Sequence, residues 1–286
     1  MKRSIFDLQA PVAPRAARGR NARTLAYKNP IEGLDDRVEF VERTHTYRVD
    51  GVKVNRSVTA LLKSCFVHDE FNPVLVIQKN LASWRSKPTS KYHNLVRDKS
   101  DGEATAAVRQ EWDRTRDLGT LLHKVIELKL NGVLDDNGIP DDVAPDMAQF
   151  EAFLSEYADL TPVRTELCMF WESSDGNVSV AGQTDAIMKD SEGRHIVIDW
   201  KRVDQDLSAD AHDWGRPGVG VMKGRSGNHL MQYSLQAHAY AEMFKKHTEI
   251  EIEACFLLQL HPSQSSFKLF RCPDLRKEAL EMLNKA

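Results

Sequence analysis

Two short segments of the sequence carry the clearest signal for chemistry: Gly182–Asp185, which reads Gly-Gln-Thr-Asp, and Ile198–Lys201, which reads Ile-Asp-Trp-Lys. Side chains alternate between the two faces of a β-strand. Asp199 and Lys201 therefore share one face of the second segment, and its two apolar residues share the other. Asp185 lies on the preceding predicted strand, across a short turn. We expect two carboxylates to converge beside one ammonium.

Carboxylates at this density suit a hard divalent cation, Mg²⁺ or Mn²⁺, because such ions prefer oxygen ligands. A bound ion of this kind lowers the pKa of a water molecule and polarises a phosphoryl oxygen. Lys201 would orient that water or offset the charge that develops on the phosphate. Because the tripeptide Asp-x-Lys is common, a surface ion pair is the ordinary alternative.

Two predicted helices add side chains of matching chemistry. His123 and Glu127 lie four residues apart, so they share a helix face, and a neutral imidazole is a frequent metal ligand. Gln236 and Tyr240 have the same spacing on a later helix. A glutamine amide can hydrogen-bond a phosphate or a base edge, and a tyrosine ring can stack on an unpaired base. Packed or solvated side chains are the alternative at each of these positions.

The hydropathy pattern distributes these residues over helices and strands. The elements predicted in the first half are a β-hairpin at Arg37–Val54 with its turn at Asp50-Gly51, a helix capped by Ser57 or Thr59 that runs through Lys63, short helices and loops at Asp69–Ser100, and helices at Gly102–Leu130 and Asp146–Ala158. Those predicted in the second half are strands at Arg164–Trp171, Val178–Met188 and His195–Trp200, a helix at His229–Lys246, strands at Glu249–Gln259 and Ser266–Arg271, and a helix at Pro273–Ala286. This order predicts an α/β fold with a central mixed β-sheet flanked by helices, after an N-terminal helical region.

The charge of the chain is distributed unevenly. Its 286 residues carry a formal net charge of −3, and this average alone disfavours a nucleic-acid partner. However, Met1–Pro30 contains seven Lys or Arg residues and one acid, and Ile77–Lys99 contains six and one. The second segment also holds Trp84 and Tyr92, and positive charge interleaved with aromatic rings suits a single strand of DNA, although solvated surfaces are the alternative. The candidate DNA-binding residues of this segment are Arg85, Lys87 and Lys91.

Composition excludes several classes of protein. The chain is 41% hydrophobic and 28% charged, as in ordinary globular proteins, and no apolar run is long enough for a membrane span. Its 4 cysteines are scattered, which argues against a disulfide framework and favours a reduced intracellular compartment. Residues 1–35 are predicted as a disordered basic arm, which would serve as a transit peptide, a nuclear signal or a DNA-gripping tail.

Taken in order, the chemical segments form a recognisable set. They read G-T-x-x-H-x-x-x-E from Gly119, G-x-x-D from Gly182, an apolar residue and D-W-K from Ile198, and Q-x-x-x-Y from Gln236. This order resembles the RecB-like branch of the PD-(D/E)XK nuclease superfamily, especially the mitochondrial genome maintenance exonucleases and related nucleases of large DNA viruses and phages. The resemblance covers most of Arg37–Arg271. Two further matching segments are the entry segment Arg56–Leu62 and the first core strand Thr165–Leu167.

The resemblance implies a restriction-endonuclease-like core in a single nuclease domain, residues 36–286. Within it, residues 36–160 would form the hairpin and a helical DNA-channel region, and residues 161–286 the catalytic core. Some relatives carry a cysteine-ligated iron–sulfur cluster. No cluster is expected here, because the cysteines lack clustered spacing: Cys65, Cys168, Cys255 and Cys272.

The resemblance also implies a role for each matching residue. The implied ligands of a Mg²⁺ or Mn²⁺ ion are His123, Asp185, Asp199 and, through its carbonyl, Trp200. Lys201 takes the place of the catalytic lysine, beside the two catalytic aspartates. The implied substrate-positioning residues are Glu166, Gln236 and Tyr240. Glu127 would support His123.

The sequence therefore predicts an enzyme, a metal-dependent deoxyribonuclease that hydrolyses phosphodiester bonds. The favoured form is an exonuclease that acts on single-stranded DNA ends in DNA replication, repair or recombination. A structure-specific endonuclease is an open alternative. The shape of the DNA channel decides whether a nuclease acts at strand ends, and the site residues do not. A catalytically silent module that binds nucleic acid is the other alternative. The loss of an aspartate or of the lysine would favour it, but every expected residue is present.

Overall fold

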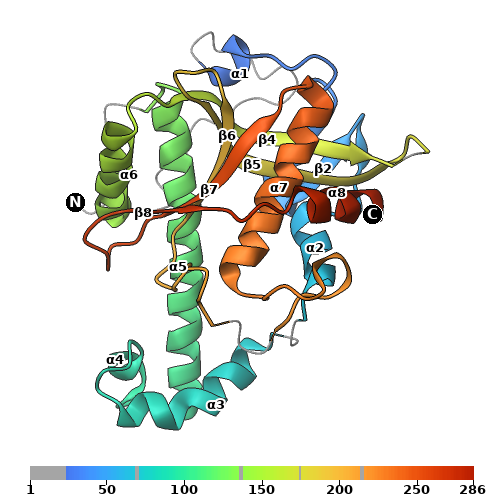
Figure 1. Cartoon of the computed structure of the whole chain (residues 1–286). Coiled ribbons are helices and arrows are strands. Elements are labelled where there is room, and N and C mark those ends of the chain that lie inside the picture. Colours follow the sequence, from blue (N-terminus) through green and yellow to red (C-terminus); the bar gives the residue numbers. More distant parts are fainter. Residues whose placement is uncertain (1–23, 68–70, 135–137, 174, 213–215) are drawn as a thin grey trace.

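The centre of the molecule is a five-stranded mixed sheet with the strand order β4-β5-β6-β7-β8, in which only β6 and β7 run parallel (Figure 1). The structure is a computed structural model that describes residues 24–67, 71–134, 138–173, 175–212 and 216–286. The strands are β4 (Thr161–Glu172), β5 (Val178–Lys189), β6 (His195–Lys201), β7 (Ile252–Gln259) and β8 (Lys268–Arg271). This arrangement confirms the predicted α/β fold with a central mixed sheet.

Four helices cover the two faces of the sheet: α5 (Asp101–Leu130), α6 (Ala144–Glu156), α7 (His229–Thr248) and α8 (Arg276–Asn284). Ile198 and Trp200 of β6 share one hydrophobic core with residues of α5 and α6. Val197 of the same strand belongs to a second core with α7 and α8. The alternation predicted along β6 is therefore confirmed. Helix α7 is the crossover that the parallel pair β6–β7 requires.

Helix α5 reaches beyond the sheet. Its 30 residues span about 45 Å at 1.5 Å per residue. Ser100 and Glu103 form a capping box at its start. Figure 1 shows α3 (Pro73–Ser86) and α4 (His93–Val96) beside the N-terminal half of α5, away from the sheet. These three helices share a small core of their own and form what we call the helical lobe.

The N-terminal hairpin contains three strands, although the sequence predicts two. β1 (Val38–Val41) pairs with β2 (Thr46–Val49), which pairs with β3 (Val52–Lys53). The predicted turn at Asp50-Gly51 joins β2 to β3, whereas the 3-10 helix η2 (Glu42–Thr44) separates β1 from β2. Residues 42–46 contain neither glycine nor proline, so the sequence gives no clear signal for this additional turn.

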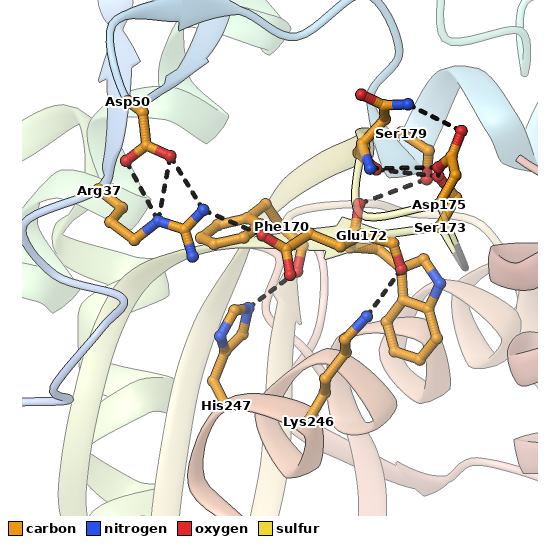
Figure 2. A network of polar contacts seen from close by, with 11 residues as sticks. Arg37, Asp50, Phe170, Glu172, Ser173, Asp175, Ser179, Lys246 and His247 are labelled. Atoms are coloured by element: carbon orange, nitrogen blue, oxygen red, sulfur yellow. Dashed lines mark hydrogen bonds and ion pairs between the residues drawn. The ribbon is translucent and has the colours of Figure 1, made fainter.

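A network of ion pairs and hydrogen bonds ties the small sheet to the central one (Figure 2). Nη2 of Arg37 lies 2.9 Å from Asp50 Oδ2 and 3.0 Å from Glu172 Oε1, at the end of β4. Lys246 of α7 donates a hydrogen bond to the backbone carbonyl of Glu172, and His247 donates one to a second carbonyl of β4. The end of β4 is therefore held by the small sheet and by α7.

The remaining helices are short: α1 (Leu25–Lys28), α2 (Val58–Leu62) and the 3-10 helices η3 (Lys63–Cys65), η4 (Asp141–Val143) and η5 (Gly220–Met222). Ser57, one of the two predicted caps, accepts a hydrogen bond from the backbone N–H of Ala60 at the start of α2. In the described part of the chain, no helix is both long and apolar enough to cross a membrane.

Residues 24–35 are folded, so the prediction of a disordered arm through residue 35 is wrong for these positions. Leu34 is fully buried, and Asp35 pairs with Arg164 of β4 at 2.8 Å. Arg164 also donates to the carbonyl of Asn29. The sequence does not predict these contacts, because the basic composition of the segment is typical of a disordered arm. The rest of the predicted arm, residues 1–23, lies outside the described residues, as do 68–70, 135–137, 174 and 213–215.

We expect Arg164→Ala to lower the free energy of unfolding by about 2–4 kcal/mol in chemical denaturation. The guanidinium is buried, and its loss leaves the carboxylate of Asp35 with only the backbone N–H of Ile31 as a donor, in a site that is only partly open to water. The matched control is Arg194→Ala, which breaks a 2.7 Å pair with Asp190 but removes an exposed side chain. Its loss should stay below about 1 kcal/mol, and equal losses would contradict the anchoring role of Arg164.

Candidate metal centre

The candidate site begins where β5 and β6 separate. The antiparallel ladder between them ends at the pair Ala186–Ile198. Beyond this pair, the backbone N–H of Trp200, two residues after Ile198, donates a hydrogen bond to Oδ2 of Asp185 at 2.9 Å. A side-chain carboxylate therefore accepts the bond that a backbone carbonyl would otherwise take. Asp185 and Asp199 both lie at this divergence, as the sequence predicts, and both are buried.

Asp199 forms the most buried ion pair of the site. Its Oδ2 lies 2.6 Å from Nζ of Lys201, and their side chains are 5% and 17% exposed. The ammonium also lies 4.5 Å from the centroid of the Tyr233 ring, on α7. The predicted face shared by Asp199 and Lys201 is therefore covered by α7, and the pair is not a surface ion pair.

A second group of ligand atoms lies on the other side of Asp185. Nδ1 of His123 lies 3.5 Å from Asp185 Oδ1 and 3.8 Å from Glu166 Oε1. One ligand atom from each of the three residues falls within 4.8 Å of the other two. Leu122 and Ile126 of α5 are fully buried, and their packing fixes the helix that carries His123.

Glu166 sits in a strained stretch of β4. Its φ is 46°, in the left-handed region, and it falls between the pairs Thr165–Ala186 and Leu167–Thr184, opposite Asp185. A residue other than glycine in this conformation costs of order 1–3 kcal/mol, and such strain concentrates at functional sites. The sequence predicts substrate positioning for Glu166, whereas the structure places its carboxylate among the candidate metal ligands.

Gln183 is a residue of the site that the sequence did not single out. Its Nε2 donates a hydrogen bond of 2.5 Å to Oε2 of Glu166. The other oxygen of Glu166, Oε1, is buried and accepts no hydrogen bond from the residues that the structure describes. Oε2 of Glu166 is thus fixed by Gln183, whereas Oε1 faces His123 and Asp185 without a hydrogen-bond donor among the described residues.

The pKa values of the site residues are shifted, because several acidic side chains are buried close together. Burial raises the pKa of Glu166 to about 7 and that of Asp199 to about 6. Burial alone would lower the pKa of His123, but the carboxylates of Asp185 and Glu166 outweigh it and raise this pKa to about 10. Burial opposes ionisation of Asp185 too, yet the charges of His123 and Lys201 hold its pKa below the usual value. His123 is therefore protonated at neutral pH when no ion is bound, and a bound cation would take the place of that proton among the carboxylates.

The residues present fit a hard divalent cation. Two carboxylates and an imidazole, from three different elements, are oxygen and nitrogen donors of the kind that Mg²⁺ and Mn²⁺ accept. The buried Oε1 of Glu166 accepts no hydrogen bond within the described residues and has only the His123 ring at 3.8 Å, so it is an atom that a cation would satisfy. Asp199 lies outside this three-residue group, beside Lys201, so its role as a ligand stays a prediction, as does that of the Trp200 carbonyl.

The remaining predicted site residues contact the centre indirectly. Glu127 pairs with Lys124 at 2.8 Å, and its negative charge helps to raise the pKa of Glu166. Gln236 donates a hydrogen bond to the hydroxyl of Tyr240 at 3.1 Å. Tyr240 is buried under Gly182, where an added Cβ would lie 2.6 Å from its ring, so the predicted stacking of this ring on a base is wrong. Tyr240 instead accepts the hydrogen bond that positions Gln236, and its ring leaves room only for glycine at position 182 of β5.

Comparison with known proteins finds neither a family model nor a curated protein that matches this chain. A solved structure described as "Crystal structure of SSO0001" is similar over 76% of this chain and 75% of that chain. The sequence identity is 16% and the TM-score is 0.31. At this level the similarity contributes nothing to the assignment of function, which rests on the residues of the site.

The basic residues predicted to bind DNA have different surroundings in the helical lobe. Arg85 donates hydrogen bonds to the carbonyls of Val96 and Lys99 and pairs with Asp101 at 2.6 Å, so its guanidinium holds α3 against α4 and α5. Lys91 pairs with Asp204, which follows β6. The aromatic rings of this segment, Trp84 and Tyr92, pack with Trp112 of α5 against the lobe core. Lys87 is exposed and has no ion-pair partner among the described residues.

Proposed function

We propose that this protein is a metal-dependent deoxyribonuclease, and that it degrades single-stranded DNA from its ends. The observation that carries the proposal is the convergence of two buried aspartates beside a buried ammonium where β5 and β6 separate. His123 and Glu166 add donors for a divalent ion on the other side of Asp185. The match of this site to the RecB-like pattern of motifs supports DNA as the substrate, and an intracellular setting in replication, repair or recombination.

The chemistry assigned to each residue follows from its charge. A Mg²⁺ or Mn²⁺ ion held by His123, Glu166 and Asp185 would polarise the phosphoryl group and lower the pKa of a water molecule. Burial opposes the charge of Lys201, but Asp199 and Asp185 outweigh it and hold its pKa above the usual value. Lys201 is therefore a cation at neutral pH, so it stabilises negative charge on the phosphate and does not remove a proton.

The decisive experiment compares linear and circular single-stranded DNA, each incubated with the protein in Mg²⁺, Mn²⁺ or EDTA. We expect the linear strand to be degraded to short products with either ion, and no degradation in EDTA. A circle that is cut would contradict the exonuclease and favour an endonuclease. If neither strand is cut but DNA is bound, the protein is a binding module and the proposed activity is wrong.

The helical lobe gives a prediction about DNA binding. Because Lys87 is exposed and unpaired in the described structure, we expect Lys87→Ala to weaken binding of single-stranded DNA and to reduce the slope of log K against log salt by about 0.7. Arg85→Ala should instead lower the thermal stability of the protein, because Arg85 bridges the lobe helices. Fluorescence anisotropy at several salt concentrations measures the first effect and a melting curve the second. An unchanged salt slope for Lys87→Ala would remove this residue from the DNA-binding surface.

A further inference from the structure

A cavity of about 150 Å³ lies between α2 and the N-terminal half of α7. Its lining residues are Thr59, Leu62, Lys63, Gln232, Tyr233 and Gln236. We call it the α2–α7 pocket. The lining includes one cation, two amides and two hydroxyl groups, and no acidic residue. Its charge is therefore opposite to that of the metal centre, where carboxylates dominate.

The α2–α7 pocket adjoins the proposed catalytic residues. Tyr233 forms part of its wall, and the ring of Tyr233 lies 4.5 Å from Nζ of Lys201. Gln236 forms another part of the wall and donates to Tyr240, whose ring contacts β5 at Gly182. A ligand in the pocket would therefore contact Tyr233, whose ring in turn contacts the ammonium of Lys201, although Lys201 itself does not line the pocket. The pocket is placed to hold the part of a strand adjacent to the bond that is cut.

The polar groups of the pocket have free capacity for a ligand. Lys63 is exposed and has neither an ion pair nor a side-chain hydrogen bond within the part of the chain that the structure describes. Gln232 donates through Nε2 to the carbonyl of Gly227, and Gln236 donates through Nε2 to Tyr240. These bonds fix both amides, and the carbonyl oxygen of each amide is the end that can accept from a ligand.

The size of the pocket limits the ligand. Drug-sized molecules occupy pockets of roughly 300–1,000 Å³, and 150 Å³ corresponds to about five water molecules. A volume of this size suits part of one nucleotide, such as a base or a sugar–phosphate unit, and excludes two stacked bases. An anionic group beside Lys63 with donor groups beside Gln232 and Gln236 is the combination that the lining matches.

We propose that the α2–α7 pocket binds a single nucleotide of the DNA strand, with its phosphate on Lys63 and its sugar or base edge on Gln232 and Gln236. The proposal rests on the proposed nuclease function for the identity of the strand. It assigns to Lys63 and Gln232 a role in binding that neither the motifs nor the metal centre requires. Because the pocket contains no carboxylate, this binding needs no divalent ion.

The test is direct binding of thymidine 5′-monophosphate to the full-length protein in EDTA, measured by calorimetry or by chemical-shift perturbation. We expect Lys63→Ala to weaken this binding at least about tenfold, as for loss of a charge-assisted hydrogen bond, and to change binding of thymidine little. The matched control is Lys53→Ala, which removes an exposed lysine from β3 and should leave binding unchanged. The same affinity for Lys63→Ala as for the wild type would overturn the proposal.

A second variant tests the site without removing its charge. Thr59 is an exposed helical residue at the pocket wall, so Thr59→Trp should fill the cavity, leave folding intact and abolish nucleotide binding. Cleavage of linear DNA is assayed separately. Suppose that the wild type cleaves DNA but that nucleotide binding is the same in the Lys63 and Thr59 variants. The proposal for the pocket would then be wrong, and the proposed nuclease activity would be unaffected. Nucleotide binding that depends on Lys63, without any cleavage, would support the pocket and overturn the nuclease.

Discussion

Lys201→Met should reduce the cleavage rate of single-stranded DNA by about 10²–10³-fold or more, while binding of the same DNA stays within a few-fold of wild type. The ammonium is buried, paired with Asp199 at 2.6 Å and positively charged at neutral pH, so it is placed to stabilise charge at the phosphate. DNA binding depends on exposed cations elsewhere, which the substitution does not touch. Single-turnover cleavage and anisotropy on the same preparation separate the two effects.

The substitution also has a structural cost that must be measured. Removing Lys201 leaves Asp199 as an unpaired carboxylate in a buried position, which raises its pKa further and lowers the stability of the fold. A melting curve shows whether Lys201→Met is folded at the assay temperature. The matched control is Lys189→Met, which removes an exposed lysine from the end of β5. Cleavage by folded Lys201→Met at the wild-type rate would remove Lys201 from the mechanism.

The sequence predicts the parts of the site that depend on local periodicity. A strand has a fixed alternation, so Asp199 and Lys201 must share a face, and the structure has this arrangement. The position of β5 before β6, with a short turn between them, places Asp185 near this pair. The capped helix α5 carries His123 toward the same end of the sheet. Local sequence and strand order are sufficient for the placements of Asp185, Asp199 and Lys201, whereas the place of His123 at the site is implied by the resemblance to the nuclease motifs.

Other parts of the site depend on register and packing, which a single sequence does not contain. Glu166 joins the metal group because β4 pairs with β5 in one register and because its backbone adopts a left-handed conformation. A shift of one residue would turn its carboxylate away. Tyr240 is buried because glycine at position 182 leaves space for its ring, a match between two elements far apart in the chain. Composition likewise does not show that Arg85 has its partners within the helical lobe.

Binding of Mn²⁺ should stabilise the protein, and Glu166→Gln should remove most of this effect. At an ion concentration of about 100 Kd, binding to the folded state alone adds about 2.7 kcal/mol, which corresponds to a rise in Tm of roughly 5–10 °C for a domain of this size. Glu166 supplies a buried oxygen without a hydrogen-bond partner beside His123 and Asp185. Its amide replacement keeps the shape of the side chain and removes its charge, so the ion loses the charge of one of its two carboxylate ligands.

Glu127→Gln is the matched control, because it makes the same chemical change one helical turn from His123. The carboxylate of Glu127 pairs with Lys124, and it reaches the centre only through its charge. Glu127→Gln should therefore retain most of the rise in Tm, whereas Glu166→Gln and Asp185→Asn lose it. Equal rises in wild type and Glu166→Gln would place the ion elsewhere. Loss of the rise in Glu127→Gln alone would place the ion at Glu127, in conflict with the convergence of His123, Glu166 and Asp185.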